Sequence, residues 1–184
     1  MTRRLKIVKL QNDGGGADGA EKWYNLRMAD MLAFRFAEER DVPLVLAFIR
    51  ELARYEKMED LVVAQEDVLR DQLFAKRNAE VVFAVEDGRE IGFALFFHNF
   101  STFLGRAGLY LEDLYVKPEC RGRGVGRAIF HELGRIARER RCGRLEWWCL
   151  DWNEPSIRFY RSLGAEAMKD WTVYRLSGKA LEDI

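Results

Sequence analysis

The residues best suited to bind or react with a ligand lie in a glycine-rich turn at residues 114–127, LYVKPECRGRGVGR. Gly122, Gly124 and Gly126 occupy every second position there, and the segment containing them lies between a strand pattern and a helical pattern. Glycines let the backbone approach a ligand closely, and the N-terminus of the following helix adds about half a positive charge. Backbone N–H groups that point at one place form a cradle for an anion. The spacing therefore predicts an anion-binding turn, with a purely structural turn as the alternative.

The charge around this turn favours a polyphosphate. Residues 117–144 carry nine basic and three acidic side chains, a net charge of +6, whereas the whole chain balances 30 basic against 30 acidic residues. The turn is not G-x-G-x-x-G, because residue 127 is Arg, and it lacks the Gly-Lys-Ser/Thr of a P-loop. A phosphate-containing ligand is therefore expected without either nucleotide motif.

The elements that must position this turn follow from hydrophobic periodicity. The sequence Asp87-Gly88 between two apolar runs is a strong hairpin signal. Strand patterns occupy residues 34–38, 81–85, 91–97, 109–116, 144–150 and 172–176, and helical patterns occupy residues 41–55, 68–73, 129–137 and 155–163. Hairpins combined with a strand-helix-strand crossover predict an α/β protein whose mixed sheet carries helices on its faces.

The same turn resembles that of the GNAT superfamily of N-acetyltransferases, whose cofactor loop Arg/Gln-x-x-Gly-x-Gly/Ala is matched by Arg121, Gly124 and Gly126. Three further stretches resemble the diamine (spermidine/spermine) acetyltransferase subfamily with its thialysine-acetylating branch: ELARYE at 51–56, LYLED at 109–113 and DWNEPSIRFY at 151–160. The resemblance spans residues 34–176. It implies the GNAT fold, with about six to seven strands in a mixed central sheet and about four flanking helices, acetyl-CoA as cosubstrate and a homodimer.

By this resemblance, Glu112 and Tyr160 carry the chemistry. An alkyl ammonium has a pKa of about 10, so a base must remove a proton before the amine can attack, and the matching glutamate does so in the subfamily. Asp113 is the next-best base. A phenol within hydrogen-bond reach can protonate a departing thiolate, which is the role that Tyr160 inherits. The alternatives are a solvated or N–H-capping carboxylate for Glu112 and core packing for Tyr160.

The resemblance also implies the cofactor contacts. The strand before the turn would offer its backbone to the pantetheine arm, the turn would hold the pyrophosphate, and a later helix would contact the rest of coenzyme A. The residues concerned are, in that order, Leu114, Tyr115 and Val116; Arg121, Gly122, Arg123, Gly124, Val125, Gly126 and Arg127; and Asn153 and Ser156.

The acceptor is expected to be a small polyamine, a diamine or a thialysine- or lysine-like amine. Residues 51–71 carry seven acidic and three basic side chains, a net charge of −4, and the subfamily's substrate contacts map onto Tyr55 and Glu56. Such a charge run is also typical of a solvated face, and Lys57 within it would repel a long polyamine.

Two other functions fit parts of the pattern. A protein lysine or N-terminal acetyltransferase would share the fold and cofactor, whereas a coenzyme A-binding sensor would bind without turnover. The sensor needs neither Glu112 nor Tyr160, so their presence favours an enzyme.

Composition sets the outer bounds. The 184 residues predict one domain at 34–184 after a flexible extension at 1–33, which contains the cluster NDGGGADG. Balanced charge argues against nucleic acid as a partner, and no apolar run is long enough for a membrane span. Three cysteines without a C-x-x-C pair and two histidines predict neither disulfides nor a metal site. The expected location is the cytoplasm.

Overall fold

The computed structural model describes residues 32–184. These residues fall into two units, one ending at Trp147 and one spanning Trp148–Ile184. The first unit contains the whole sheet, and the second contains two short helices.

The first unit is built on a five-stranded sheet with the order β1-β2-β3-β4-β5. Strands β1 to β4 pair antiparallel, and β5 pairs parallel to β4. Their bounds are β1 (Ala33–Phe36), β2 (Glu80–Glu86), β3 (Arg89–Ser101), β4 (Arg106–Val116) and β5 (Leu145–Trp147). The predicted mixed sheet is confirmed, although the strand count is five rather than six to seven.

The turn between β2 and β3 forms as its sequence predicts. Asp87 and Gly88 both have positive φ angles, of 49° and 74°. A two-residue hairpin loop with both φ angles positive matches the right-handed twist of its strands, and Asp-Gly is one of the pairs that tolerates it.

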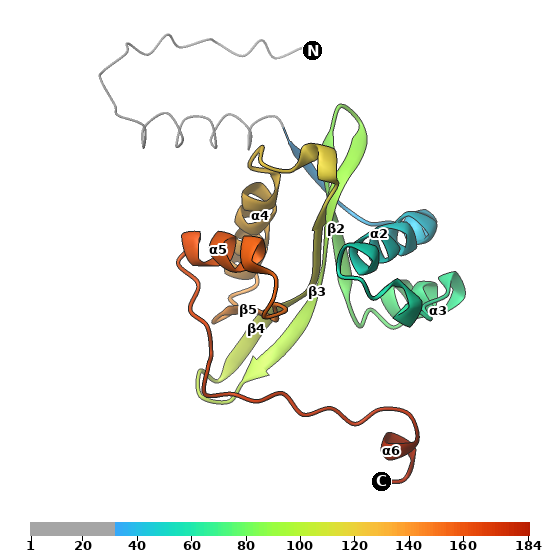
Figure 1. Ribbon diagram of the computed structural model, residues 1–184, viewed down its shortest axis with the longest axis vertical. Coiled ribbons are helices and arrows are strands. Elements are labelled where there is room, and N and C mark those ends of the chain that lie inside the picture. Colours follow the sequence, from blue (N-terminus) through green and yellow to red (C-terminus); the bar gives the residue numbers. More distant parts are fainter. Residues whose placement is uncertain (1–31) are drawn as a thin grey trace. The chain divides into compact units, whose positions relative to one another are not determined.

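Helices cover both faces of the sheet in the first unit (Figure 1). Helices α2 (Val42–Tyr55) and α3 (Glu66–Arg70) lie on one face and α4 (Val125–Glu139) on the other. Short helical segments flank them: η1 (Glu39–Asp41), η2 (Glu59–Leu61), the π-helical η3 (Asp71–Ala75) and η4 (Pro118–Cys120). The crossover from β4 through α4 to β5 explains why these two strands are parallel.

The core beneath α2 is centred on Phe48, which is 1% exposed. Its ring centroid lies 5.1 Å from that of Phe93, 5.8 Å from Phe83 and 6.2 Å from Tyr115. Burying one such side chain stabilises the fold by roughly 1.5–3 kcal/mol. Phe48 therefore fixes α2 over the middle of the sheet, above strands β2, β3 and β4.

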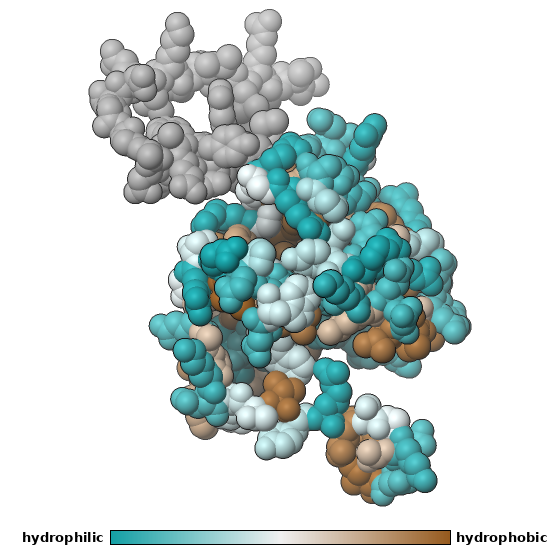
Figure 2. Space-filling view, in the orientation of Figure 1, coloured by the Kyte–Doolittle hydropathy of each residue, from teal (hydrophilic) through white to brown (hydrophobic). Residues whose placement is uncertain are grey.

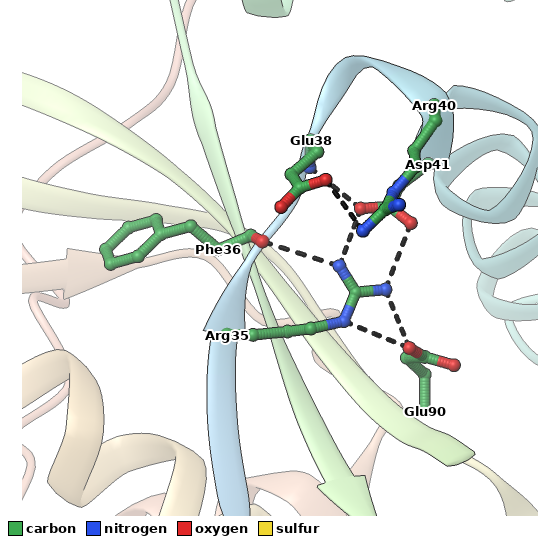
Figure 3. Close-up of polar contacts among 6 residues, drawn as sticks. All are labelled: Arg35, Phe36, Glu38, Arg40, Asp41 and Glu90. Atoms are coloured by element: carbon green, nitrogen blue, oxygen red, sulfur yellow. Dashed lines mark hydrogen bonds and ion pairs between the residues drawn. The ribbon is translucent and has the colours of Figure 1, made fainter. Parts of the chain in front are cut away.

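A guanidinium at the edge of the sheet ties three elements together (Figure 3). Arg35 of β1 donates to both carboxylate oxygens of Asp41, at 2.6 and 3.0 Å, and to Glu90 of β3 at 2.6 Å. The same Asp41 accepts from the backbone N–H of Glu38 at 2.8 Å, closing the turn before α2. This network sets where α2 begins relative to the sheet.

The outer surface of α2 is largely hydrophilic, and apolar side chains gather beside α3 (Figure 2). Exposed apolar residues in this region are Leu61, Val63 and Val68. The predicted helical stripe at 68–73 is thus split, because Leu73 is buried while Val68 faces solvent.

The second unit contains α5 (Glu154–Ser162) and α6 (Lys179–Glu182). The predicted strand at 172–176 is wrong, since residues 171–177 carry no regular structure, and the strand expected at 144–150 shortens to β5. Trp148, Trp152 and Trp171 are each more than half exposed. At the end of the first unit, the Trp147 ring packs edge-on against Phe130 of α4, with centroids 4.9 Å apart.

The expected boundary at residue 33 falls close to the start of the described structure. Leu32 is 6% exposed and Ala33 opens β1, so both belong to the folded part. The rest of the expected extension, residues 1–31, lies outside the described residues. No helix among the described residues is both long and apolar enough to cross a membrane.

Candidate active site

The site forms where β4 loses its neighbour on one side. Strand β5 pairs with β4 only from Leu109 to Leu111, where Leu111 lies opposite Trp147. Among residues 32–147, no strand pairs with residues 112–116 of β4 on their β5 side. Backbone N–H and C=O groups along such an open edge can pair with an extended ligand that contains amides.

A β-bulge interrupts β4 at the same place. Leu95 of β3 lies opposite Asp113, and Phe96 lies opposite Leu111, so Glu112 has no partner in the ladder. Bulges bend the strand, re-aim side chains and are frequent next to active sites. The candidate base is therefore the extra residue of the bulge.

The pairing register of β4 with β3 shows which face of the sheet the Asp113 side chain occupies. Tyr115 belongs to the core beneath α2, and Asp113 lies two residues before it on the same strand face. Leu95, the partner of Asp113, packs against that core as well. Asp113 therefore faces α2, whose C-cap is Glu56.

Three carboxyl groups thus gather at this end of the sheet: Glu56, Glu112 and Asp113. Among residues 32–184, no hydrogen bond or ion pair joins any of them to another side chain. Burial raises the pKa of Asp113 to about 7, with further contributions from the negative charges of Glu112 and Glu56. Burial also raises the pKa of Glu56. Such a group of uncompensated carboxyls offers a binding site for a cation.

Tyr110 borders this carboxylate cluster on β4. Burial, with the negative charges of Glu112 and Glu146, raises its pKa to about 12. The phenol therefore keeps its proton at neutral pH and can act as a hydrogen-bond donor.

The glycine-rich turn has the geometry expected of an anion cradle. Gly122 and Gly124 have φ angles of +71° and +82°, and Gly124 is the N-cap of α4, a helix of 15 residues. The N–H groups of a first helical turn have no acceptor within the helix, and the helix dipole makes this end positive. Leu114, Tyr115, Val116 and the turn from Gly122 to Gly126 thus form one continuous path from the open strand edge to the helix N-terminus.

Several basic side chains in and near the turn are already paired within the protein, so fewer of them can bind an anion than the net charge of the segment implies. Arg123 is paired with Glu86 of β2 at 2.6 Å. Arg121 stacks over Tyr55 and Tyr115, with its guanidinium carbon 4.6 and 5.1 Å from their centroids, and donates to the Val116 carbonyl at 2.8 Å. Of the other basic residues at 117–144, Arg135, Arg140 and Arg144 are also ion-paired. Backbone groups and the helix dipole are therefore the features of this turn best suited to bind an anion.

The remaining predicted site residues lie in the second unit, on α5. Asn153 is buried and caps this helix, its side-chain oxygen accepting from the Ser156 N–H at 3.3 Å. Tyr160 is partly buried, and its ring lies beside that of Phe159, with centroids 5.4 Å apart. The structure thus gives Asn153 and Ser156 a local capping role in addition to any contact with a ligand.

Sequence reasoning did not single out Glu51 and Lys117, although both line a pocket next to the carboxylate cluster. Glu51 lies four residues before Tyr55, so the two share a helix face, and Lys117 directly follows β4. That spacing could have indicated Glu51. Among residues 32–184, no group of three or more His, Cys, Asp or Glu side chains is arranged to hold a metal ion.

Comparison with known proteins bears on this site. The model of the acetyltransferase (GNAT) family matches residues 45–165. Thialysine N-epsilon-acetyltransferase of Bos taurus is 35% identical over 162 residues, covering 82% of this chain and 95% of the relative. L-Ornithine N5-acetyltransferase of Arabidopsis thaliana is 29% identical over 196 residues, covering 82% of this chain and 86% of the relative. An integron cassette protein from V. cholerae has a solved structure with a TM-score of 0.71 and 27% identity, covering 83% of this chain and 96% of that one.

Proposed function

Because the chain belongs to the GNAT family of acetyltransferases, we propose that it acetylates a primary amine of a small polyamine, diamine or lysine-like amino acid. N-Acetyltransferase activity follows from the family and from the named relatives. One observation carries the acceptor class. Within residues 32–184, the carboxylate cluster of Glu56, Glu112 and Asp113 is paired with no cation. A cationic amine would supply the missing charge.

The residues of the first unit fit acetyl-CoA, the cosubstrate of this family. The positive end of α4 and the glycine backbone suit a pyrophosphate, and the open edge at residues 112–116 suits the amide-containing pantetheine arm. When bound, acetyl-CoA supplies a thioester carbonyl for direct attack by the amine. Arg121, Arg123 and Arg127 would contribute through their backbone as part of the turn.

Glu112 is the proposed base. Its exposed side chain leaves the ladder at the bulge, where it can take a proton from an ammonium directly or through water. Asp113 is the second candidate, since a carboxyl with a pKa of about 7 is half ionised near neutral pH. Tyr160 is the proposed acid that protonates the departing thiolate, whose parent pKa is about 8.5.

The acceptor class is tested by comparing putrescine with butylamine, which has the same four-carbon chain but one cation. The carboxylate cluster should favour putrescine by roughly 10-fold or more in kcat/KM, and added salt should reduce that ratio. Spermidine, thialysine, ornithine, lysine and a lysine peptide complete the panel. Equal turnover of putrescine and butylamine, or a strong preference for the peptide, would contradict the proposed acceptor.

Glu56→Gln provides a second test of the same cluster. The variant should raise KM for putrescine by roughly 3- to 10-fold while leaving butylamine almost unchanged. Asp60→Asn is the matched control, since Asp60 loses the same charge from an exposed position in the next turn. A comparable effect from both variants would place Glu56 outside the acceptor site.

Glu112→Gln tests the base. Without this carboxylate, the low-pH limb of the rate profile should shift or disappear, and activity should partly recover as pH approaches the pKa of the amine itself. Asp113→Asn, measured in parallel, decides between the two carboxyls. An unchanged low-pH limb in Glu112→Gln, together with loss of that limb in Asp113→Asn, would assign the base to Asp113.

A homodimer in the cytoplasm completes the proposal. Apolar residues at the tip of the β3–β4 hairpin, Phe100, Phe103 and Leu104, are exposed and support an interface between copies. Cys120, Cys142 and Cys149 are all free thiols, as is usual in a reducing compartment. Analytical ultracentrifugation checks the mass, and a monomer at micromolar concentration would contradict the dimer.

A further inference from the structure

The carboxylate cluster of Glu56, Glu112 and Asp113 carries more negative charge than its surroundings balance. Within residues 32–184, none of the three carboxyl groups is ion-paired or hydrogen-bonded to another side chain. Carboxylates that share one site without a cation disfavour the charge of one another, so they do not all stay ionised at neutral pH. One of the three is therefore expected to hold a proton in the free protein.

Asp113 is the group best placed to hold that proton. Glu112 is exposed at the bulge, where water stabilises its charge, whereas Asp113 is partly buried. Asp113 directly follows Glu112 on β4 and faces α2, whose C-cap is Glu56, so it adjoins both of the other carboxyl groups. Burial, with the negative charges of Glu112 and then Glu56, raises its pKa to about 7. For Glu56, burial alone raises the pKa.

The elements packed around Asp113 bring no positive charge to it. Strand β3 places the uncharged Leu95 opposite it. The titratable groups that face this side of the sheet are all acidic: Tyr110, Glu112 and Tyr115 on β4 and Glu56 on α2. Among the described residues, no cation lowers the pKa of Asp113.

Two cations near the end of β4 are held on aromatic rings instead. The Lys117 ammonium lies 5.3 Å from the centroid of Phe48, and the Arg121 guanidinium carbon lies 4.6 Å from that of Tyr55. Neither contributes to the pKa of Asp113. The positive charge that balances this carboxyl group therefore comes from a proton or from a ligand.

We propose that Asp113 exchanges its proton for the second ammonium of a diammonium acceptor. In the free protein the O–H bond of Asp113 is intact. When the acceptor binds, that bond breaks, the proton passes to solvent, and the carboxylate pairs with the ammonium that is not acetylated. One positive charge thus leaves the carboxyl group as another arrives. This inference rests on the proposed acetyltransferase activity and adds a proton-linked control of acceptor binding to it.

The exchange makes acceptor affinity depend on pH in a range where the diamine itself does not titrate. A carboxyl group with a pKa of about 7 is about nine-tenths protonated at pH 6 and about one-tenth protonated at pH 8. Alkyl ammonium groups, with a pKa of about 10, keep their charge throughout. Because the protonated carboxyl must first ionise, the affinity for putrescine should rise about 10-fold from pH 6 to 8.

Calorimetry with putrescine as the probe measures this proton directly. The protein is saturated with coenzyme A, which has no acetyl group to transfer, so binding occurs without turnover. Titrations in buffers of different ionisation enthalpy give the number of protons released. We expect about 0.5 per site at pH 7, rising towards one at pH 6 and falling towards zero at pH 8. No release at pH 7, or an affinity that does not change from pH 6 to 8, would overturn the exchange.

Asp113→Asn assigns the proton to its residue. The variant should release almost no proton at pH 7, and its affinity for putrescine should be nearly independent of pH between 6 and 8. Asp60→Asn is the matched control, since it removes a carboxylate from an exposed position in the next turn and should leave both measurements unchanged. Undiminished release from Asp113→Asn would show that another group supplies the proton and would overturn the assignment.

Glu56→Gln replaces Asp113→Asn should that variant not fold. Because the charge of Glu56 contributes to the raised pKa of Asp113, its removal should move the midpoint of proton release to lower pH and reduce the release at pH 7. A midpoint that stays near pH 7 would overturn the proposal.

The exchange and its premise fail in different measurements. If amines of the panel are acetylated but putrescine binds without pH-linked proton release, the exchange is wrong and acetyl transfer stands. If putrescine binds with proton release but no amine of the panel is acetylated, the proposed function is wrong.

Discussion

At the scale of single residues, the site departs from the rules that stabilise the rest of the fold. Arg35 satisfies Asp41 and Glu90, whereas Glu56, Glu112 and Asp113 face no cation within the described residues. Residues that violate local rules of charge satisfaction commonly do so because a ligand needs them. The carboxylate cluster should therefore cost stability in the free protein.

Asp113→Asn should show that cost through its pH dependence. The folded state raises the pKa of Asp113 from its ordinary value near 3.9 to about 7, so the folded form keeps a proton that the unfolded chain releases. The stabilisation is complete below pH 4 and is lost as pH rises through 7. Between pH 4 and 8, the Asn variant should gain roughly 1–3 kcal/mol relative to the natural protein in urea unfolding. Asp60→Asn should show no such trend, and a flat difference for Asp113→Asn would contradict the raised pKa.

Tyr160→Phe isolates the proposed acid because it keeps the ring and removes only the hydroxyl. We expect kcat to fall by roughly 10²–10⁴ with little change in acetyl-CoA affinity, since the thiolate then leaves without a proton. Tyr174→Phe, at an exposed residue of the same unit, is the control. Retention of more than about a third of kcat under chemistry-limited conditions would remove Tyr160 from the mechanism.

Residue types were more predictable than residue orientation. The family resemblance pointed to Glu112 as base, with Asp113 second, and to Glu56 in the acceptor region. The bulge changes the alternation of side chains along β4, and a shift of one residue moves a side chain to the other face of a sheet. The sequence alone could therefore not predict that the side chain of Asp113 faces α2.

At the scale of elements, the glycine-rich turn joins the end of β4 to the N-terminus of α4, where the helix dipole is positive. The glycines of this turn were readable from the sequence, and Gly122 and Gly124 do have the positive φ angles that glycine permits. The ion pairs that neutralise Arg123 and Arg140 were not readable, because their partners Glu86 and Glu80 are distant in sequence. Net charge by itself therefore overstated the positive field.

Gly124→Ala should weaken acetyl-CoA binding by at least about 10-fold in calorimetry, because a residue with Cβ resists a φ of +82° and the N-cap must shift. The protein should remain folded with a modest loss of stability. Gly105→Ala is the matched control, since Gly105 also has a positive φ, of +62°, and open space around its added Cβ. Similar affinity in the two variants would separate the turn from cofactor binding.

Strand prediction succeeded where a partner strand exists in the same unit. The patterns at 81–85, 91–97 and 109–116 correspond to β2, β3 and β4, each hydrogen-bonded to neighbours. Residues 172–176 have a comparable alternation but pair with no strand among residues 32–184, and they are exposed. Side-chain pattern gives the capacity to form a strand, and pairing decides whether it forms.

At the scale of the whole molecule, the described residues begin with Leu32, which is buried, and β1 follows at once. Arg35 of this first strand holds the start of α2 through Asp41. The site elements lie later in the chain, from α2 onward. We therefore expect the first 30 residues to be dispensable for acetyl transfer.

A chain that starts at Met31 should keep its turnover number, and analytical ultracentrifugation should still show a dimer. A chain that starts at Phe36 is the control, because it loses most of β1 together with Arg35, and it should unfold at markedly lower urea concentration. A large loss of activity in the Met31 chain would show that residues 1–30 complete the site or an interface.

The distribution of tryptophan has a spectroscopic consequence. The five indoles are at positions 23, 147, 148, 152 and 171, so none lies between the start of β1 and the last strand of the sheet. Of the four indoles in the Met31 chain, Trp147 lies in β5, and Trp148, Trp152 and Trp171 lie after it, where their solvent-exposed rings would give red-shifted emission. The red-shifted part of the emission would thus report on the C-terminal unit, the Trp147 signal on the edge of the sheet, and far-ultraviolet circular dichroism on melting of the sheet as a whole.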